Sequence, residues 1–184
     1  MKRGIRIPED YERGGSDFLA ATRVWQGQKR LHEIIDAFLL ADLDSTLYVA
    51  GETNLKAKDS RIKMLGLLSQ KELRRYQSAC RTLISIVWLD CMPNSVCEFL
   101  CSGGNVVTTS ASGTAEIVDK KLVLSEKPWD FRPCDQNRPP KIDVEALATL
   151  LRKSVSMPPQ GCSHVHIDTI AAQYKAFFEE LLGG

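Results

Sequence analysis

Basic side chains gather in one stretch of the chain, between residues 54 and 85. Eight lysines and arginines fall there against two acids, whereas the whole 184-residue chain has a formal net charge of only +1. Cationic groups can neutralise phosphates, and an aromatic ring beside them can stack on a base. The sequence therefore predicts a nucleic-acid-contacting surface with these members: Lys56, Lys58, Arg61, Lys63, Lys71, Arg74, Arg75, Tyr76 and Arg81. The alternative is that these residues form the solvated faces of amphipathic helices.

Two acids that follow an apolar run form a second candidate site. Residues 37–47 read AFLLADLDSTL, so that Asp42 and Asp44 stand in the pattern Asp-x-Asp-x-Thr-Leu. This segment resembles the first motif of the haloacid dehalogenase-like phosphatases. The resemblance implies that Asp42 takes the phosphoryl group, that Asp44 is the general acid and base, and that Thr46 orients the loop. Two carboxylates at this spacing would also hold Mg²⁺, a hard cation that prefers oxygen ligands.

The sequence around these acids also supports a simpler interpretation. Apolar residues recur with helical spacing from Leu31 to Leu43, so Asp42 and Asp44 would finish a helix. The rest of the phosphatase pattern is not matched, because no Gly-Asp stretch with a second acid shortly after it occurs later in the chain. We therefore keep a Mg²⁺-dependent phosphohydrolase as the alternative function.

A third group of residues could bind zinc. Cys97 and Cys101 are one helical turn apart, and Cys162 and His164 could complete a tetrahedral site. The competing interpretation is that these cysteines are free thiols that fill space in an apolar helix, as buried cysteines commonly do. We favour the free thiols and expect no cofactor.

The elements that must position these residues are predicted to be mainly helical. Ser69 and Glu72 have the spacing of a capping box, Asp143 can cap a later helix, and Ser16 or Asp17 can cap the first. Residues 82–89, the last part of the helix expected at 69–89, are β-branched and apolar and could instead be a buried strand. Helices are expected in these ranges: 16–43 (one helix or two), 55–68, 69–89, 95–101, 143–155 and 167–182.

Short stretches rich in Val and Thr follow this helical part. Residues 105–110, 114–119 and 121–125 are separated by turn signals and predict a three-stranded antiparallel meander. The predicted fold class is α+β, a mostly helical body with a small antiparallel sheet at about residues 105–125. Residues 1–15 are expected to be a flexible arm, and residues 16–184 a single domain. Within this domain we expect a helical part at 16–102, the small sheet, a proline-rich loop at 128–141 and C-terminal helices in 143–184.

Composition and charge limit the class of protein. With 43% hydrophobic and 26% charged residues, the chain is neither collagen-like nor of low complexity. The N-terminus lacks the apolar core of a secretory signal, and the longest strongly apolar stretch is too short to span a bilayer. We therefore expect a soluble, cytoplasmic protein without a membrane partner.

The sequence favours a non-catalytic subunit or adaptor that contacts nucleic acid or a ribonucleoprotein through residues 54–85, with a protein partner. No complete catalytic set supports an enzyme beyond the phosphohydrolase alternative. A second alternative is a pure protein-interaction module that uses Trp129, Phe131 and the C-terminal helix.

Overall fold

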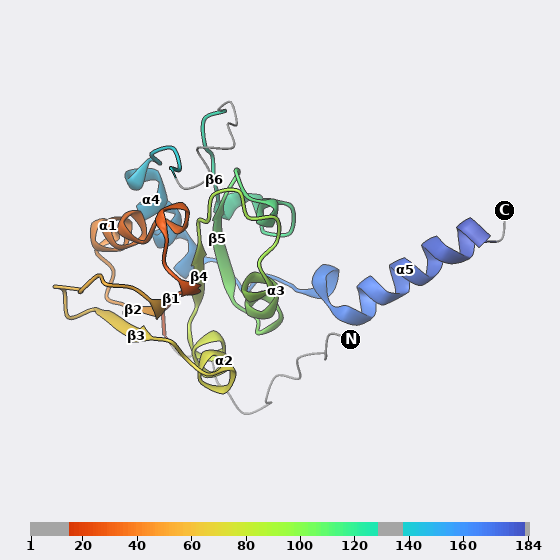
Figure 1. Cartoon of the computed structure of the whole chain (residues 1–184), viewed down its shortest axis with the longest axis horizontal. Coiled ribbons are helices and arrows are strands. Elements are labelled where there is room, and N and C mark those ends of the chain that lie inside the picture. The colour runs from red at the N-terminus through yellow and green to blue at the C-terminus, as the bar shows by residue number, and fades with distance from the viewer. Residues whose placement is uncertain (1–14, 129–137, 183–184) are drawn as a thin grey trace.

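One parallel β-sheet of six strands forms the centre of the molecule (Figure 1). The computed structural model describes residues 15–128 and 138–182. The strand order is β3-β2-β1-β4-β5-β6, and every neighbouring pair is parallel. The strands are β1 (Phe18–Val24), β2 (Leu47–Glu52), β3 (Ile62–Gly66), β4 (Thr82–Ser85), β5 (Asn105–Thr109) and β6 (Val123–Leu124).

Helices cover both sides of this sheet. The α-helices are α1 (Leu31–Ala41), α2 (Gln70–Ala79), α3 (Asn94–Cys101), α4 (Val144–Ser156) and α5 (Ile167–Leu182). Helices α1 and α4 pack together on one side, and α3, which contacts α2, lies on the other (Figure 1). Short 3₁₀ turns complete the connections: η1 (Gly27–Lys29), η2 (Gly113–Glu116), η3 (Lys120–Leu122) and η5 (Ser163–Val165).

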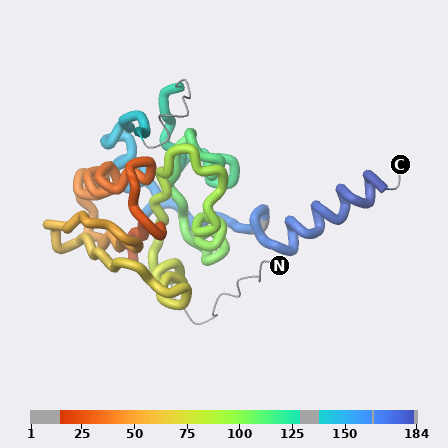
Figure 2. Tube along the Cα trace, in the orientation of Figure 1, coloured from red at the N-terminus to blue at the C-terminus, as the bar shows by residue number. Residues whose placement is uncertain are grey.

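Helix α5 stands apart from this layered body. Figures 1 and 2 show it extending away from the sheet and its covering helices. None of its residues is buried, and it exposes Ile167, Tyr174, Phe177, Phe178, Leu181 and Leu182. The second alternative function used this helix together with Trp129 and Phe131, which lie outside the described residues.

The inner strands are buried on both faces, which explains their composition. All residues of β4 and β5 are buried, and β1 begins with three buried residues. Parallel strands covered by helices on both sides carry continuous apolar runs rather than an alternating pattern. The predicted apolar stripe of α1 packs on this sheet, and the ring of Phe38 meets that of Phe18 edge to face at 5.8 Å between centroids.

The predicted α+β class with a small antiparallel sheet is wrong. Residues 105–109 are a strand, but this strand is β5, an inner member of the parallel sheet. The next two predicted strands are replaced by η2, η3 and the two-residue strand β6. The chain crosses over through these 3₁₀ turns instead of reversing, so Thr108 pairs with Val123 in parallel.

Two predicted helices are strands as well. The segment after Asp17 forms β1, and the predicted helix at 55–68 contains β3. Asp17 caps no helix; its carboxylate accepts a hydrogen bond from the Thr46 N–H at 2.8 Å and joins the starts of β1 and β2. The alternative of a buried strand within 82–89 is confirmed by β4.

The caps predicted for α2 and α4 are confirmed. The Ser69–Glu72 capping box opens α2, and the Asp143 carboxylate accepts from the Ala146 N–H at the start of α4. Within the described ranges, no helix has the length and apolar character that crossing a bilayer requires. Apart from Gly15, the predicted arm falls outside the described residues.

Candidate functional site

The strand order reverses between β1 and β4, and this position defines the candidate site. From β1 the sheet continues through β2 to β3 on one side, and from β4 through β5 to β6 on the other. In open α/β sheets, ligands bind in the crevice outside the carboxyl ends of the strands at such a switch point. The two loops that flank it are tied together, because the Trp88 N–H donates to the Gln28 carbonyl oxygen at 2.9 Å.

Backbone strain is concentrated in these two loops. Three described residues other than glycine have positive φ: Arg30 at 54°, Asp42 at 48° and Leu89 at 59°. Arg30 ends the loop after β1, and Leu89 lies in the loop after β4. A left-handed residue with a side chain costs about 1–2 kcal/mol and persists only where its surroundings hold it. Both loops at the switch point are thus held in fixed conformations.

A cleft of about 470 Å³ opens beside the loop after β1. It is bounded by this loop, the first turn of α1 and residues 53–55. Trp25 lines it and is fixed from two sides, since its Nε1–H donates to the Ala50 oxygen at 3.1 Å and its backbone N–H to the Glu52 oxygen at 2.9 Å. A Cβ on Gly51 would stand 2.2 Å from the Thr22 carbonyl oxygen, so this close packing requires glycine.

The end of β1 and the segment that follows it carry groups that suit an anion bearing hydroxyls. Arg23, near the end of β1, is exposed and forms no ion pair with any described residue. Lys29 lies in η1, where its ammonium donates to the Thr22 hydroxyl. The first turn of α1 receives no side-chain cap from the described part of the chain, so it presents free N–H groups and the positive end of the helix dipole. Glu33 also lines the cleft and can accept hydrogen bonds from hydroxyls.

Arg30 forms the most extensive polar contact at this edge. Its side chain is fully buried and makes a bidentate ion pair with Glu126, with N···O distances of 2.6 and 2.7 Å. The same guanidinium donates to the Pro140 oxygen at 3.1 Å. Sequence reasoning missed Arg30 because it lies outside the basic cluster and in no motif.

The loops after β4 and β5 complete the edge. The Asp90 carbonyl oxygen accepts from the Gly113 N–H at 2.9 Å and from the Ser112 hydroxyl at 3.1 Å. Leu89 and Met92 remain exposed, at 40% and 43% of their surface. They give the loop after β4 an apolar surface on which a planar ring could pack.

The predicted basic surface is only partly assembled. Three of its nine residues are engaged within the protein: Arg61 pairs with Asp59 at 3.0 Å, Arg81 donates to the Met157 oxygen, and the Tyr76 ring packs on that of Tyr48 at 5.0 Å. The other six side chains are exposed on the loop after β2, on β3 and on α2: Lys56, Lys58, Lys63, Lys71, Arg74 and Arg75.

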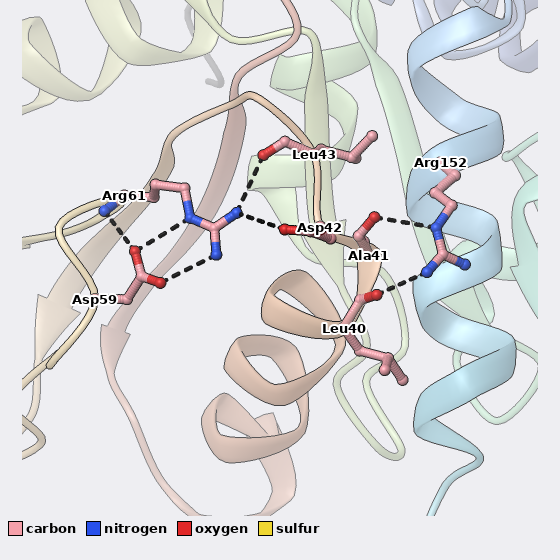
Figure 3. A network of polar contacts seen from close by, with 7 residues as sticks. All are labelled: Leu40, Ala41, Asp42, Leu43, Asp59, Arg61 and Arg152. Carbon is pink, nitrogen blue, oxygen red and sulfur yellow. Dashed lines mark hydrogen bonds and ion pairs between the residues drawn. The ribbon is translucent and has the colours of Figure 1, made fainter.

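Asp42 and Asp44 lie at the opposite edge of the sheet, before β2 begins. Figure 3 shows the contacts around Asp42. Asp42 ends α1, and its carboxylate accepts from Arg61 at 3.3 Å. Arg152 donates to the Ala41 and Leu40 oxygens at 3.0 and 2.6 Å. Two cations thus satisfy the negative end of α1. Asp42 is the C-cap of α1 and Asp44 lies in the bend before β2, whereas the phosphatase motif ends a strand.

The thiols come close together without forming a metal site. The Cys101 thiol contacts that of Cys162, with Cys97 nearby; burial first, and then Cys162, raises the pKa of Cys101 to about 11. His164 is directed elsewhere, its Nε2 lying 2.8 Å from the Ile117 oxygen. In residues 15–128 and 138–182, no three His, Cys, Asp or Glu side chains are grouped to hold a metal ion.

Comparison with known proteins identifies relatives of this fold. Residues 15–132 match the family described as "Glycosyl transferases group 1". The glycosyltransferase WaaG of lipopolysaccharide biosynthesis superposes with a TM-score of 0.59 at 18% identity, over 91% of this chain and 44% of its own. A UDP-forming α,α-trehalose-phosphate synthase from Burkholderia xenovorans superposes with a TM-score of 0.60 at 18% identity, over 89% of this chain and 41% of its own. HepE of Anabaena, in complex with UDP-glucose, superposes with a TM-score of 0.51 at 13% identity, over 86% of this chain and 48% of its own.

The chain spans less than half the length of these three solved proteins. No curated protein sequence matches it. The likeness nevertheless agrees with the observed topology, a Rossmann-like parallel α/β sheet of the glycosyltransferase GT-B type.

These matches overturn the predicted function. The expectation of a non-catalytic, nucleic-acid-contacting adaptor is wrong, and neither the phosphohydrolase nor the pure interaction module fits a family of transferases. The charge cluster was a poor guide because closeness in sequence does not show which edge of a sheet a residue occupies.

Proposed function

Because this chain belongs to the group 1 glycosyl transferases, we propose that the carboxyl edge of its sheet binds the nucleotide part of an activated sugar donor. Transfer of the sugar to an acceptor is the reaction to which this binding contributes. The observation that carries the proposal is the switch point between β1 and β4, flanked by a cleft and by strained, mutually bonded loops.

The charges at this edge suit a diphosphate leaving group. When the sugar leaves its nucleotide, the bond between the anomeric carbon and the diphosphate oxygen breaks, and negative charge builds up on that oxygen. Arg23 and Lys29, with the open first turn of α1, would stabilise this charge. We assign the diphosphate to this part of the edge.

The remaining groups suit the rest of a nucleotide. The Glu33 carboxylate can accept hydrogen bonds from ribose or sugar hydroxyls. Leu89 and Met92 offer an apolar surface to the base. One of the similar structures contains UDP-glucose and another is named as UDP-forming, so we propose a UDP-sugar as the donor.

The acceptor is assigned to a different part of the enzyme. The chain spans 44% of the WaaG chain and 41% of the trehalose-phosphate synthase chain. We therefore propose that polypeptide beyond this shared unit supplies the acceptor site.

Calorimetric titration with UDP and UDP-glucose tests the donor site. We expect Arg23→Met and Lys29→Met each to raise the Kd for UDP about tenfold, because each loses a charged contact. Lys71→Met, which removes an exposed cation on α2, is the matched control and should leave the Kd unchanged. Absence of UDP binding by the wild type, or equal losses in all three variants, would contradict the proposal.

A further inference from the structure

We infer that Arg30 and Glu126 together are positioning residues that hold the donor-binding loop after β1 in its working conformation. This inference rests on the proposed donor site. Arg30 ends that loop and is also the residue from which α1 begins. Moving Arg30 would therefore move Lys29 on one side and the first turn of α1 on the other.

The Arg30 guanidinium joins segments that are distant in sequence. It pairs in bidentate fashion with Glu126, which follows β6, and donates to the Pro140 oxygen at 3.1 Å on the approach to α4. A longer contact of 3.5 Å reaches the Ile86 oxygen just after β4. Glu126 in turn donates its N–H to the Ser110 hydroxyl, directly after β5, at 2.8 Å. Arg30 and Glu126 together thus connect the segments that follow β1, β4, β5 and β6 across the switch point.

Stability alone does not account for this arrangement. A buried ion pair must give up its hydration, and replacing such a pair by apolar side chains of similar volume is often neutral or stabilising. Arg30 is 1% exposed, its backbone is left-handed, and its Nε has no hydrogen-bond partner among the described residues. Two apolar side chains would fill the same space without the loss of hydration and without the unpartnered Nε, while the left-handed backbone would stay as it is.

The fixed directions of the ion pair explain its use at this position. An apolar contact tolerates small shifts, whereas a bidentate guanidinium–carboxylate pair sets both distance and angle. Arg30 itself lines the cleft, so its position fixes the rim that the donor meets. The pair therefore serves donor binding more than it serves folding.

Removing both partners at once separates these two roles. In the double variant Arg30→Met with Glu126→Leu, no buried charge is left unpaired, so urea unfolding should give a free energy close to that of the wild type. The Kd for UDP, measured by calorimetry, should rise by about 10- to 100-fold, because small misplacements of a site carry losses of this size. Hydrogen exchange should become faster at the amides of residues 25–33 and stay unchanged in the inner strands.

A conservative variant covers the case in which the double variant does not fold. Arg30→Lys keeps the charge but cannot form the bidentate pair, and we expect weaker UDP binding and faster exchange at residues 25–33. Arg61→Met removes the ion pair with Asp59 at the amino ends of the strands, away from the switch-point loops. This variant is the control and should leave UDP binding unchanged.

The outcomes distinguish this inference from the proposed function. If the wild type binds no UDP, the proposed function fails. If the wild type binds UDP and the folded double variant binds it equally well, the inference fails while the donor site stands. Where the double variant does not fold, equal binding by Arg30→Lys has the same meaning.

Discussion

Replacing Gly51 by alanine should destabilise the protein by about 4 kcal/mol, from two separate causes. The φ of Gly51 is 118°, a conformation in which a side chain is strained by about 1–3 kcal/mol. The new Cβ would also stand 2.2 Å from the Thr22 oxygen and 3.2 Å from Trp25 Nε1. Because the closer atom belongs to the backbone of β1, relief requires β1 and β2 to separate, at about 1–3 kcal/mol for overpacking.

Two other glycines isolate the two causes. Gly66 has a φ of 68°, but apart from its two chain neighbours no described residue has an atom within 4 Å of the place where a Cβ would stand, so Gly66→Ala should cost only the backbone strain, about 1–2 kcal/mol. Gly113 has no left-handed φ, but its Cβ would lie 1.9 Å from the Cys91 oxygen, so Gly113→Ala should report overpacking alone.

Urea denaturation followed by tryptophan fluorescence measures all three variants. We expect Gly51→Ala to lose more stability than either of the others, and to bind UDP more weakly as well, since Trp25 and the cleft depend on this packing. A Gly51→Ala protein no less stable than Gly66→Ala would refute the reasoning.

Three further predictions concern other parts of the molecule. Ser69→Ala should cost about 1 kcal/mol by removing the capping box. The Ser69 hydroxyl and N–H lower the pKa of Glu72 from 4.5. The difference in unfolding free energy between wild type and Ser69→Ala should therefore be present above pH 4.5 and shrink as the pH falls through that lowered pKa. A difference in unfolding free energy that does not depend on pH would argue against this. The pKa of Cys101 is raised from 9.0 to about 11, so the contribution of this thiol to stability should be present below pH 9 and lost as the pH rises through 11. Iodoacetamide labelling followed by peptide mapping should find the exposed Cys91 modified before Cys101. Modification of Cys101 before Cys91 would count against the raised pKa. Arg152→Met should lower the unfolding free energy by about 1 kcal/mol through loss of the hydrogen bonds at the end of α1, and an unchanged urea midpoint would contradict this role.

The helices could be predicted because their signals are local. The apolar stripe of α1, the capping box of α2 and the Asp143 cap of α4 each lie within a few residues of the helix that they define. Composition indicated β4 and β5 as strands, but no local signal gives the partners or the direction of a strand. β1 reads FLAATRV, an apolar run without alternation, and its direction relative to β2 and β4 is set by contacts distant in sequence. The Val- and Thr-rich stretches at 105–125 likewise carry no mark that separates a hairpin from a parallel crossover.

The candidate site could not be predicted from charge for a related reason. Arg23 and Lys29 lie outside the basic cluster, and they gain meaning only because they stand at the end of β1 and in the loop after it, where the sheet order reverses. Asp42 and Asp44 looked catalytic as a motif, but they precede β2 and therefore lie at the amino edge. Recognition of alternating strands and helices along the chain would have placed the loops after each strand together.

The strand order also has a consequence for the route by which the chain folds. β1 is the first strand of the sequence and an inner strand of the sheet: Phe18 pairs with Leu47 on one side and with Thr82 on the other. The pairing with β4 closes a much longer loop, at a greater entropic cost and a lower rate. We expect β1, β2 and β3 to associate first and to leave one edge of β1 unpaired until β4 arrives. The seam between β1 and β4 is then the last to close, so the crevice at the switch point forms only when folding is complete.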